Sequence, residues 1–235
     1  SASPFLLEGG RRGVPGGRPA ASPGRRTKAE TVIGLHYIDE ALLVAEKPAG
    51  LLSVPGRLPE NQDCLVARLQ ASYPDVLTVH RLDQVTSGLM LYARGKQVQA
   101  ALSMQFEQRR VHKRYQAVVE GQVAGEAGEI ALPLICDWPN RPRQMVDLER
   151  GKPALTRWRV LARDAGQAWT RVELEPVTGR SHQLRLHMAS AGHPIVGDGL
   201  YGARPAPRVQ LHACRLDFVH PLSGVAMAFV SPSPF

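Results

Sequence analysis

One aspartate, Asp83, lies in a polar segment between two apolar runs, where a carboxylate could act on a substrate. Residues 76–79 precede the segment and residues 89–93 follow it, and both runs have the β-branched and apolar composition of strands. A loop held at both ends by strands is a usual place for a catalytic group. The alternative is a turn in which Asp83 and Ser87 bond backbone amides and Gly88 takes a left-handed conformation.

Arg185 is a second candidate, because it borders an apolar stripe in residues 178–191. Its position predicts a half-buried guanidinium, which requires a carboxylate partner. Gly192 can end the helix that the stripe indicates, and Ser181 lies near its start. The alternative is an ordinary amphipathic helix with its arginines in solvent. The stripe has helical spacing and consists of Leu184, His187, Met188 and Ala191.

Five potentially cationic side chains and one tyrosine follow one another in residues 109–115. The cations could clamp phosphates, and Tyr115 could stack on a base. The alternative is a solvated helix end, where Lys and Arg favour the negative pole of the helix dipole. The cationic residues are Arg109, Arg110, His112, Lys113 and Arg114.

Composition excludes several classes of protein. The chain has 235 residues and 43% hydrophobic content, which suits one ordinary domain. No apolar run approaches the ~20 residues of a membrane helix, and the first seven residues are too short for a signal-peptide core. Three distant cysteines without a C-x-x-C pair argue against disulfides, and His182 and His187 lack the i, i+4 spacing of a helical metal site. We expect a cytoplasmic protein without membrane, metal or cofactor.

The charge of +8 is unevenly distributed. Residues 1–28 are rich in Gly, Pro, Ser and Arg, and they hold six basic residues against the single acidic Glu8. We expect this part to be a disordered basic extension. Residues 29–235 therefore carry only +3 of the total charge. This charge by itself supports a nucleic-acid partner only weakly.

Two motifs resemble those of a known enzyme family. The letters H-R-L-D-x-x-T-S-G at residues 80–88 resemble the signature of the RluA family of RNA pseudouridine synthases, whose catalytic aspartate corresponds to Asp83. The letters T-G-R-x-H-Q-L-R at residues 178–185 resemble the second signature, whose last arginine is the ion-pair partner of that aspartate. The resemblance spans about residues 34 to 235. Residues 50–57, 133–142 and 151–154 are similar to the dual-specificity subgroup of the family, which acts on tRNA and 23S rRNA.

The resemblance implies isomerisation of uridine in RNA, in which the N1–C1′ bond breaks and C5 bonds to C1′. A fixed carboxylate suits this reaction, because the ribosyl fragment becomes electron-poor. Arg185 would favour the ionised carboxylate, and Tyr115 would pack against the target uracil, as the tyrosine of the family's K-x-Y motif does. Asp83, Arg185 and Tyr115 would thus form the catalytic set. The residues expected to bind substrate or RNA are Arg81, His80, Thr86, Lys113, Arg114, Arg180, His182 and Gln183.

A stacked uridine hides C1′ and C5, so the target must be flipped out of its stack. We expect single-stranded loops within structured RNA, namely a tRNA anticodon stem-loop and a large-subunit rRNA hairpin. Arg81 is a candidate to fill the vacated stack. We also expect a monomer whose catalytic domain, residues 29–235, has no S4 domain beside it.

These residues must be positioned by strands and helices of moderate length. Strands are expected at residues 41–45, 76–79, 89–93 and 116–120, with a hairpin of 156–163 and 170–177. Helices are expected after Asp63 as a cap, across residues 95–110, and at Arg185. Three prolines make residues 133–142 an ordered loop, in which Trp138 is expected to anchor the core. This mixture predicts an α+β protein. The resemblance sharpens it to the pseudouridine synthase fold, with a central mixed, mostly antiparallel sheet, flanking helices and a central cleft.

Three other functions remain open from the residues alone. An aspartate-nucleophile hydrolase acting on glycosides would need a second acid or a histidine near Asp83, and His80 is the one candidate. A non-catalytic RNA-binding module would tolerate Asp83→Asn. A structural ribosomal component would be more basic than +3 in its folded part.

Overall fold

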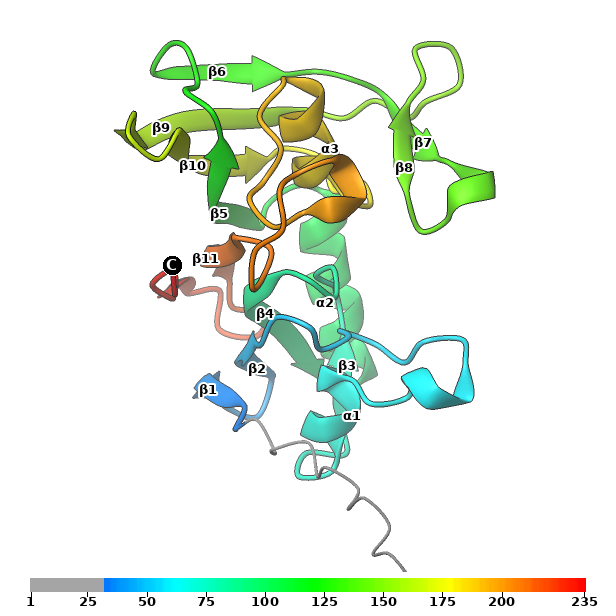
Figure 1. Cartoon of the computed structure of the whole chain (residues 1–235). Coiled ribbons are helices and arrows are strands. Elements are labelled where there is room, and N and C mark those ends of the chain that lie inside the picture. The colour runs from blue at the N-terminus through cyan, green and yellow to red at the C-terminus, as the bar shows by residue number, and fades with distance from the viewer. Residues whose placement is uncertain (1–31) are drawn as a thin grey trace, which may run out of the picture. The chain divides into compact units, whose positions relative to one another are not determined.

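Ten strands build one mixed sheet in the computed structural model, which describes residues 32–235 (Figure 1). Eight of them follow the order β1-β2-β4-β11-β5-β10-β9-β6, while β3 pairs with β4 and β12 pairs with β11. The predicted extension at residues 1–28 lies outside the described residues. The strands of this sheet are β1 (Gly34–Ile38), β2 (Leu42–Lys47), β3 (Val76–Thr78), β4 (Ser87–Arg94), β5 (His112–Glu120), β6 (Ala127–Ile130), β9 (Thr156–Asp164), β10 (Trp169–Pro176), β11 (Leu211–Val219) and β12 (Ala226–Val230).

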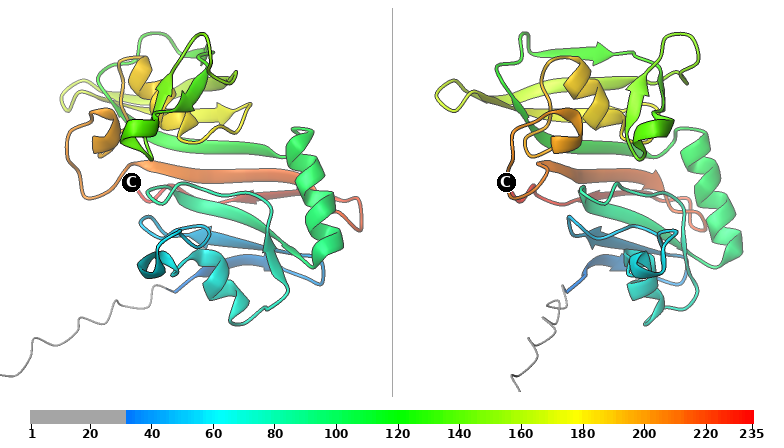
Figure 2. Two further views of the ribbon diagram at one scale, coloured as in Figure 1. Left: turned by 90° about the vertical axis from the view of Figure 1, so that its right-hand side faces the viewer. Right: turned by 45° about the vertical axis from the view of Figure 1, so that its right-hand side comes forward.

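Both faces of the central strands are buried, which explains their continuous apolar sequences. On β4, Met90 and Tyr92 pack into a core cluster that includes residues of the helices α1 (Leu65–Gln70) and α3 (Gln183–Ser190). Its alternate residues Leu89 and Leu91 enter a second cluster with α2 (Lys96–Glu107), which packs on β3 and β4 (Figure 2). The α+β architecture and the hairpin of β9 and β10 are confirmed.

The centre of the sheet places the Asp83 loop close to Tyr115. Strands β4 and β11 run parallel, with Ala213 opposite Gly88, and β5 lies on the other side of β11, with Tyr115 also opposite Ala213. Gly88 has φ +121°, and a side chain there would collide with the backbone of Ala213. This glycine therefore permits β11 to approach the end of the Asp83 loop.

Two local expectations are wrong. Asp63 does not cap α1, because Cys64 occupies the N-cap position, and Asp63 instead forms an ion pair with Arg68 at 2.8 Å. Trp138 does not anchor the core, because its side chain is 63% exposed and the Arg141 guanidinium lies 4.4 Å from the centre of its ring.

The segment around Trp138 forms a structure of its own. Strands β7 (Leu134–Cys136) and β8 (Gln144–Val146) pair in a separate two-stranded sheet, drawn beside the main sheet in Figure 1. The 3-10 helix η2 (Trp138–Asn140) joins them. The prolines of the segment lie outside both strands, so they do not prevent this pairing. Two further 3-10 helices are η1 (Pro59–Asn61) and η3 (Gly199–Tyr201). No helix within residues 32–235 is long and apolar enough to cross a membrane.

Candidate active site

Hydrogen bonds on both sides of Asp83 fasten its loop to a neighbouring segment. The Leu82 N–H donates to Ser53 Oγ at 3.0 Å, and the Ser53 hydroxyl donates to the Leu82 carbonyl at 2.7 Å. On the other side, the Gly50 N–H donates to the Gln84 carbonyl at 2.7 Å. The backbone of Asp83 is thus held between two fixed neighbours, which restricts the directions its carboxylate can take.

Lys47 also ties the Asp83 loop to the neighbouring segment. Its side chain is fully buried, and its ammonium donates to three carbonyls, those of Pro48, Leu51 and Gln84, at 2.9, 2.6 and 3.0 Å. Burial lowers the pKa of Lys47 to about 7, while the negative charge of Asp83 opposes that shift. Sequence reasoning did not select Lys47. The available signal was a lysine that directly follows the apolar run 41–45 and Glu46 at the end of the strand.

The predicted ion pair between Arg185 and Asp83 is present. Arg185 Nη1 donates to Asp83 Oδ2 at 3.3 Å, joining residues 102 positions apart. The Arg185 side chain is 5% exposed and that of Asp83 is 25% exposed. The turn alternative holds for the backbone, where the Thr86 N–H donates to the Asp83 carbonyl at 3.0 Å and Gly88 has a positive φ. It fails for the side chains, because Ser87 Oγ contacts His212 Nδ1 at 2.8 Å and Asp83 bonds Arg185 rather than nearby backbone amides.

A second carboxylate, Asp198, holds the same guanidinium. Arg185 Nε and Nη2 donate to the two oxygens of Asp198 at 2.7 and 2.9 Å, and the Asp198 side chain is 2% exposed. The ring of Tyr201 lies 5.2 Å from Arg185 Cζ. Tyr201 Oη accepts the Gln144 N–H at 3.0 Å and lies 2.7 Å from His182 Nδ1. Burial lowers the pKa of His182, so its neutral ring can accept a hydrogen bond from the Tyr201 hydroxyl.

Asp83 lies where a small slot meets a larger pocket. The slot, of about 70 Å³, is lined by Asp83, Arg185, Tyr115 and Thr86 among others. The pocket, of about 450 Å³, shares Asp83, Arg185 and Arg81 with the slot. Burial and the charge of Asp83 raise the pKa of Tyr115. Tyr115 therefore presents a neutral phenol to the slot, which suits contact with a base.

Three of the side chains predicted to contact RNA make bonds within the protein. His80 Nε2 accepts the Leu91 N–H at 2.9 Å, and its ring stacks on Phe106. Gln183 is 3% exposed, and its amide bonds Thr178, Arg180, Leu155 and Thr156 within the protein. Arg114 follows Lys113 on β5, so it points to the opposite face from Lys113 and Tyr115, and it pairs with Glu173 at 3.3 Å. All three side chains thus bond within the protein, and their contact with RNA stays a prediction.

The other predicted contacts border the pockets. Arg81 is exposed and borders both the slot and the larger pocket, and His182 lines the larger pocket. Thr86 is 2% exposed on the wall of the slot. Lys113 and Arg180 line a third pocket nearby.

Comparison with known proteins identifies the family. Residues 41–190 match the family model described as RNA pseudouridylate synthase. The chain belongs to this family. The synthase is 50% identical over 206 residues to the dual-specificity RNA pseudouridine synthase RluA of Vibrio vulnificus, covering 85% of this chain and 82% of that protein. Its identity to the protein of the same name from Escherichia coli is 47% over 203 residues, covering 85% and 92%.

Solved structures agree with the fold. The human RNA pseudouridylate synthase domain containing 1 is 30% identical, with a TM-score of 0.73 and coverage of 87% of this chain and 84% of that chain. The human RNA pseudouridylate synthase domain containing 4 shares the fold, with 24% identity and a TM-score of 0.68. The pseudouridine synthase fold and the reaction expected from the motifs are confirmed. The synthase is an isomerase that converts uridine to pseudouridine in RNA, and the three alternative functions are set aside.

Proposed function

We propose that Asp83 is the catalytic carboxylate of this synthase and that its substrates are a tRNA anticodon stem-loop and a hairpin of 23S rRNA. The observation that supports the first part is the placement of Asp83 at the junction of slot and pocket, with one carboxylate oxygen bonded to Arg185. Its other oxygen has no hydrogen-bond partner within residues 32–235, so it is available to a substrate.

The reaction needs no oxidant, energy source or metal ion. The N1–C1′ bond breaks, the uracil turns over, C5 bonds to C1′, C5 loses a proton and N1 gains one. The negative charge of Asp83 stabilises the electron-poor ribosyl fragment. Asp83 either bonds to C1′ and is displaced when C5 bonds there, or it accepts a proton from C2′ and returns that proton to C2′ as the C5–C1′ bond forms. Tyr115 packs its neutral ring on the flipped uracil, and Arg185 keeps the carboxylate in place.

The substrates follow from accessibility. A flipped nucleotide reaches the slot at least cost from a loop, whose bases are less stacked and unpaired. Arg81 lies at the rim beside Asp83, where its guanidinium can fill the space that the target base leaves. About 50% identity to proteins named for dual specificity supports two kinds of RNA substrate, and the motif resemblance implies that these are tRNA and rRNA. We propose that the synthase acts on them as a monomer in the cytoplasm.

Mapping pseudouridine after incubation with purified protein tests this proposal. The RNAs are tRNA transcripts and 23S rRNA fragments, each compared with a version in which the target loop is closed by base pairing. We expect pseudouridine in the open loops of both RNA classes. Modification of the paired versions at the same rate, or of neither class, would contradict the proposed substrates.

A further inference from the structure

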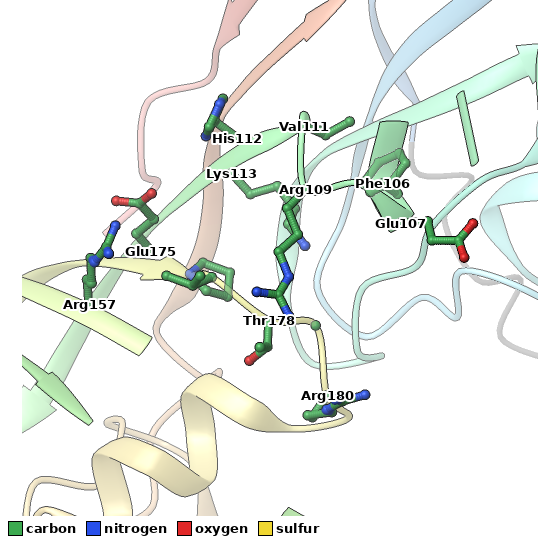
Figure 3. Close-up of a pocket in the computed structure, with 13 residues that line it drawn as sticks. Phe106, Glu107, Arg109, Val111, His112, Lys113, Arg157, Glu175, Thr178 and Arg180 are labelled. Carbon is green, nitrogen blue, oxygen red and sulfur yellow. The ribbon is translucent and has the colours of Figure 1, made fainter. Parts of the chain in front are cut away.

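A cationic pocket opens beside the slot and shares one wall residue with it. The pocket has a volume of about 330 Å³. Pro176, at the end of β10, lines both this pocket and the slot that contains Asp83. The basic side chains that line the pocket are Arg109, His112, Lys113, Arg157 and Arg180, and the carboxylates of Glu107 and Glu175 line it as well (Figure 3).

Both walls of the pocket continue elements of the active site. Lys113 precedes Tyr115 by two residues on β5, so the two side chains share a face of the strand about 7 Å apart. On the other wall, Thr178, Gly179 and Arg180 lead directly into α3, which carries Arg185. An RNA strand whose target base lies on Tyr115 therefore has its neighbouring backbone within reach of the pocket.

Three of the cations lack an acidic partner. Arg157 pairs with Glu129 at 2.9 Å. By contrast, no ion pair within residues 32–235 engages Arg109, Lys113 or Arg180. Lys113 contacts the ring of Phe106 at 5.9 Å, and Arg180 donates to the Pro153 carbonyl at 3.0 Å. The lining thus holds four Arg or Lys side chains against two glutamates, and this excess of positive charge favours an anion.

Arg109 lies in the turn after α2 and extends its side chain across the pocket. Its backbone has φ +56°, a left-handed conformation that is uncommon outside glycine. Figure 3 shows its side chain reaching from the turn after α2 toward Thr178 on the opposite wall. The next residue, Arg110, is also exposed but does not line the pocket.

We propose that this pocket binds an RNA phosphate adjacent to the target uridine, held by Arg109, Lys113 and Arg180. The inference rests on the proposed function, because it takes the target base to lie in the slot beside Asp83. A phosphate supplies the negative charge that the three cations lack, and it draws the flanking backbone against Pro176. The pocket then fixes the position of the RNA strand relative to the slot, independently of base sequence.

Binding measurements with a chemically altered RNA test this inference. Dissociation constants are measured over a series of salt concentrations for a stem-loop substrate and for the same stem-loop with neutral methylphosphonates flanking the target. The variants are Arg109→Gln, Lys113→Gln and Arg180→Gln. Arg110→Gln is the matched control, because it removes an equal charge one residue outside the pocket. Melting temperatures confirm that each variant is folded.

We expect each pocket variant to weaken binding of the unaltered RNA about tenfold, the usual scale for a charged hydrogen bond. The slope of log affinity against log salt should fall by about 0.7 for the phosphate lost. On the methylphosphonate RNA the same variants should lose almost nothing, whereas Arg110→Gln should affect both RNAs equally. Equal losses on both RNAs, or losses no larger than that of Arg110→Gln, would overturn the phosphate site.

Pseudouridine formation by the wild-type protein in the unaltered stem-loop separates this inference from the proposed function. No product would refute the proposed substrate and, with it, the pocket's place beside the target. Normal product together with pocket variants that behave like Arg110→Gln would refute only the phosphate site.

Discussion

The guanidinium of Arg185 forms a buried, two-point ion pair with the carboxylate of Asp198, at 2.7 and 2.9 Å. This pair fixes the plane of the guanidinium and leaves one nitrogen, Nη1, directed at Asp83. The three side chains together carry one net negative charge in a largely buried site. Asp198 therefore positions the arginine that positions Asp83.

Replacing Arg185 should damage stability and activity together. Arg185→Ala leaves Asp198 buried without a charged partner, a change that costs about 3–5 kcal/mol in buried pairs. The free energy of unfolding, measured with denaturant, and the rate of pseudouridine formation should both fall. Arg215→Ala is the control, because it breaks an exposed pair with Asp217 that solvent screens, so the stability should change little. An Arg185→Ala protein as stable and active as this control would contradict the arrangement.

Lys47 should make stability depend on pH. Because burial lowers its pKa to about 7 in the folded protein, the unfolded chain binds more protons between pH 7 and the ordinary lysine value of 10.5. The unfavourable charge is fully present below pH 7 and is relieved as the pH rises. The free energy of unfolding of the wild type, relative to Lys47→Met, should therefore increase from pH 7 to pH 10. A constant or decreasing difference would show that the ammonium stays charged in the folded protein.

Trp138 should contribute little to stability despite its size. Its side chain is mostly exposed, so Trp138→Ala should change the free energy of unfolding by less than about 1 kcal/mol. Trp158 is the comparison, because it packs against the main core and should cost several times more when replaced by alanine. Thermal melting of the two variants decides the matter, and equal large losses would place Trp138 in the folded core.

The contrast between these tryptophans shows where sequence reasoning succeeds. Apolar runs such as that of β4 specify buried strands locally, and the motifs selected Asp83 and Arg185. The motifs did not select Asp198, because its role depends on a loop that returns after α3 to meet Arg185. The strand order was also beyond reach, since the insertion of β11 between β4 and β5 depends on pairs of residues far apart in the sequence, such as His212 and Ser87. The prediction for Trp138 failed because residues 133–146 pair with themselves rather than with the main sheet.

Arg81 should matter most when the target must be extracted from a stack. If its guanidinium replaces the flipped base, Arg81→Ala should slow modification of a structured stem-loop more than that of an unstructured oligonucleotide with the same loop sequence. The ratio of the two rates, measured for wild type and variant, is the readout. Equal losses on both RNAs would mean that Arg81 only helps to position Asp83.

The role of Asp83 is tested most directly by single-turnover pseudouridine formation with Asp83→Asn and Asp83→Ala proteins, alongside their affinity for the same stem-loop RNA. Hydrogen bonds from Ser53 and Gly50 hold the backbone of the loop, so both variants should fold and bind RNA. We predict that neither variant forms detectable pseudouridine while RNA binding persists. Product formed by the pure Asp83→Ala protein at about a tenth of the wild-type rate or faster would contradict the assignment.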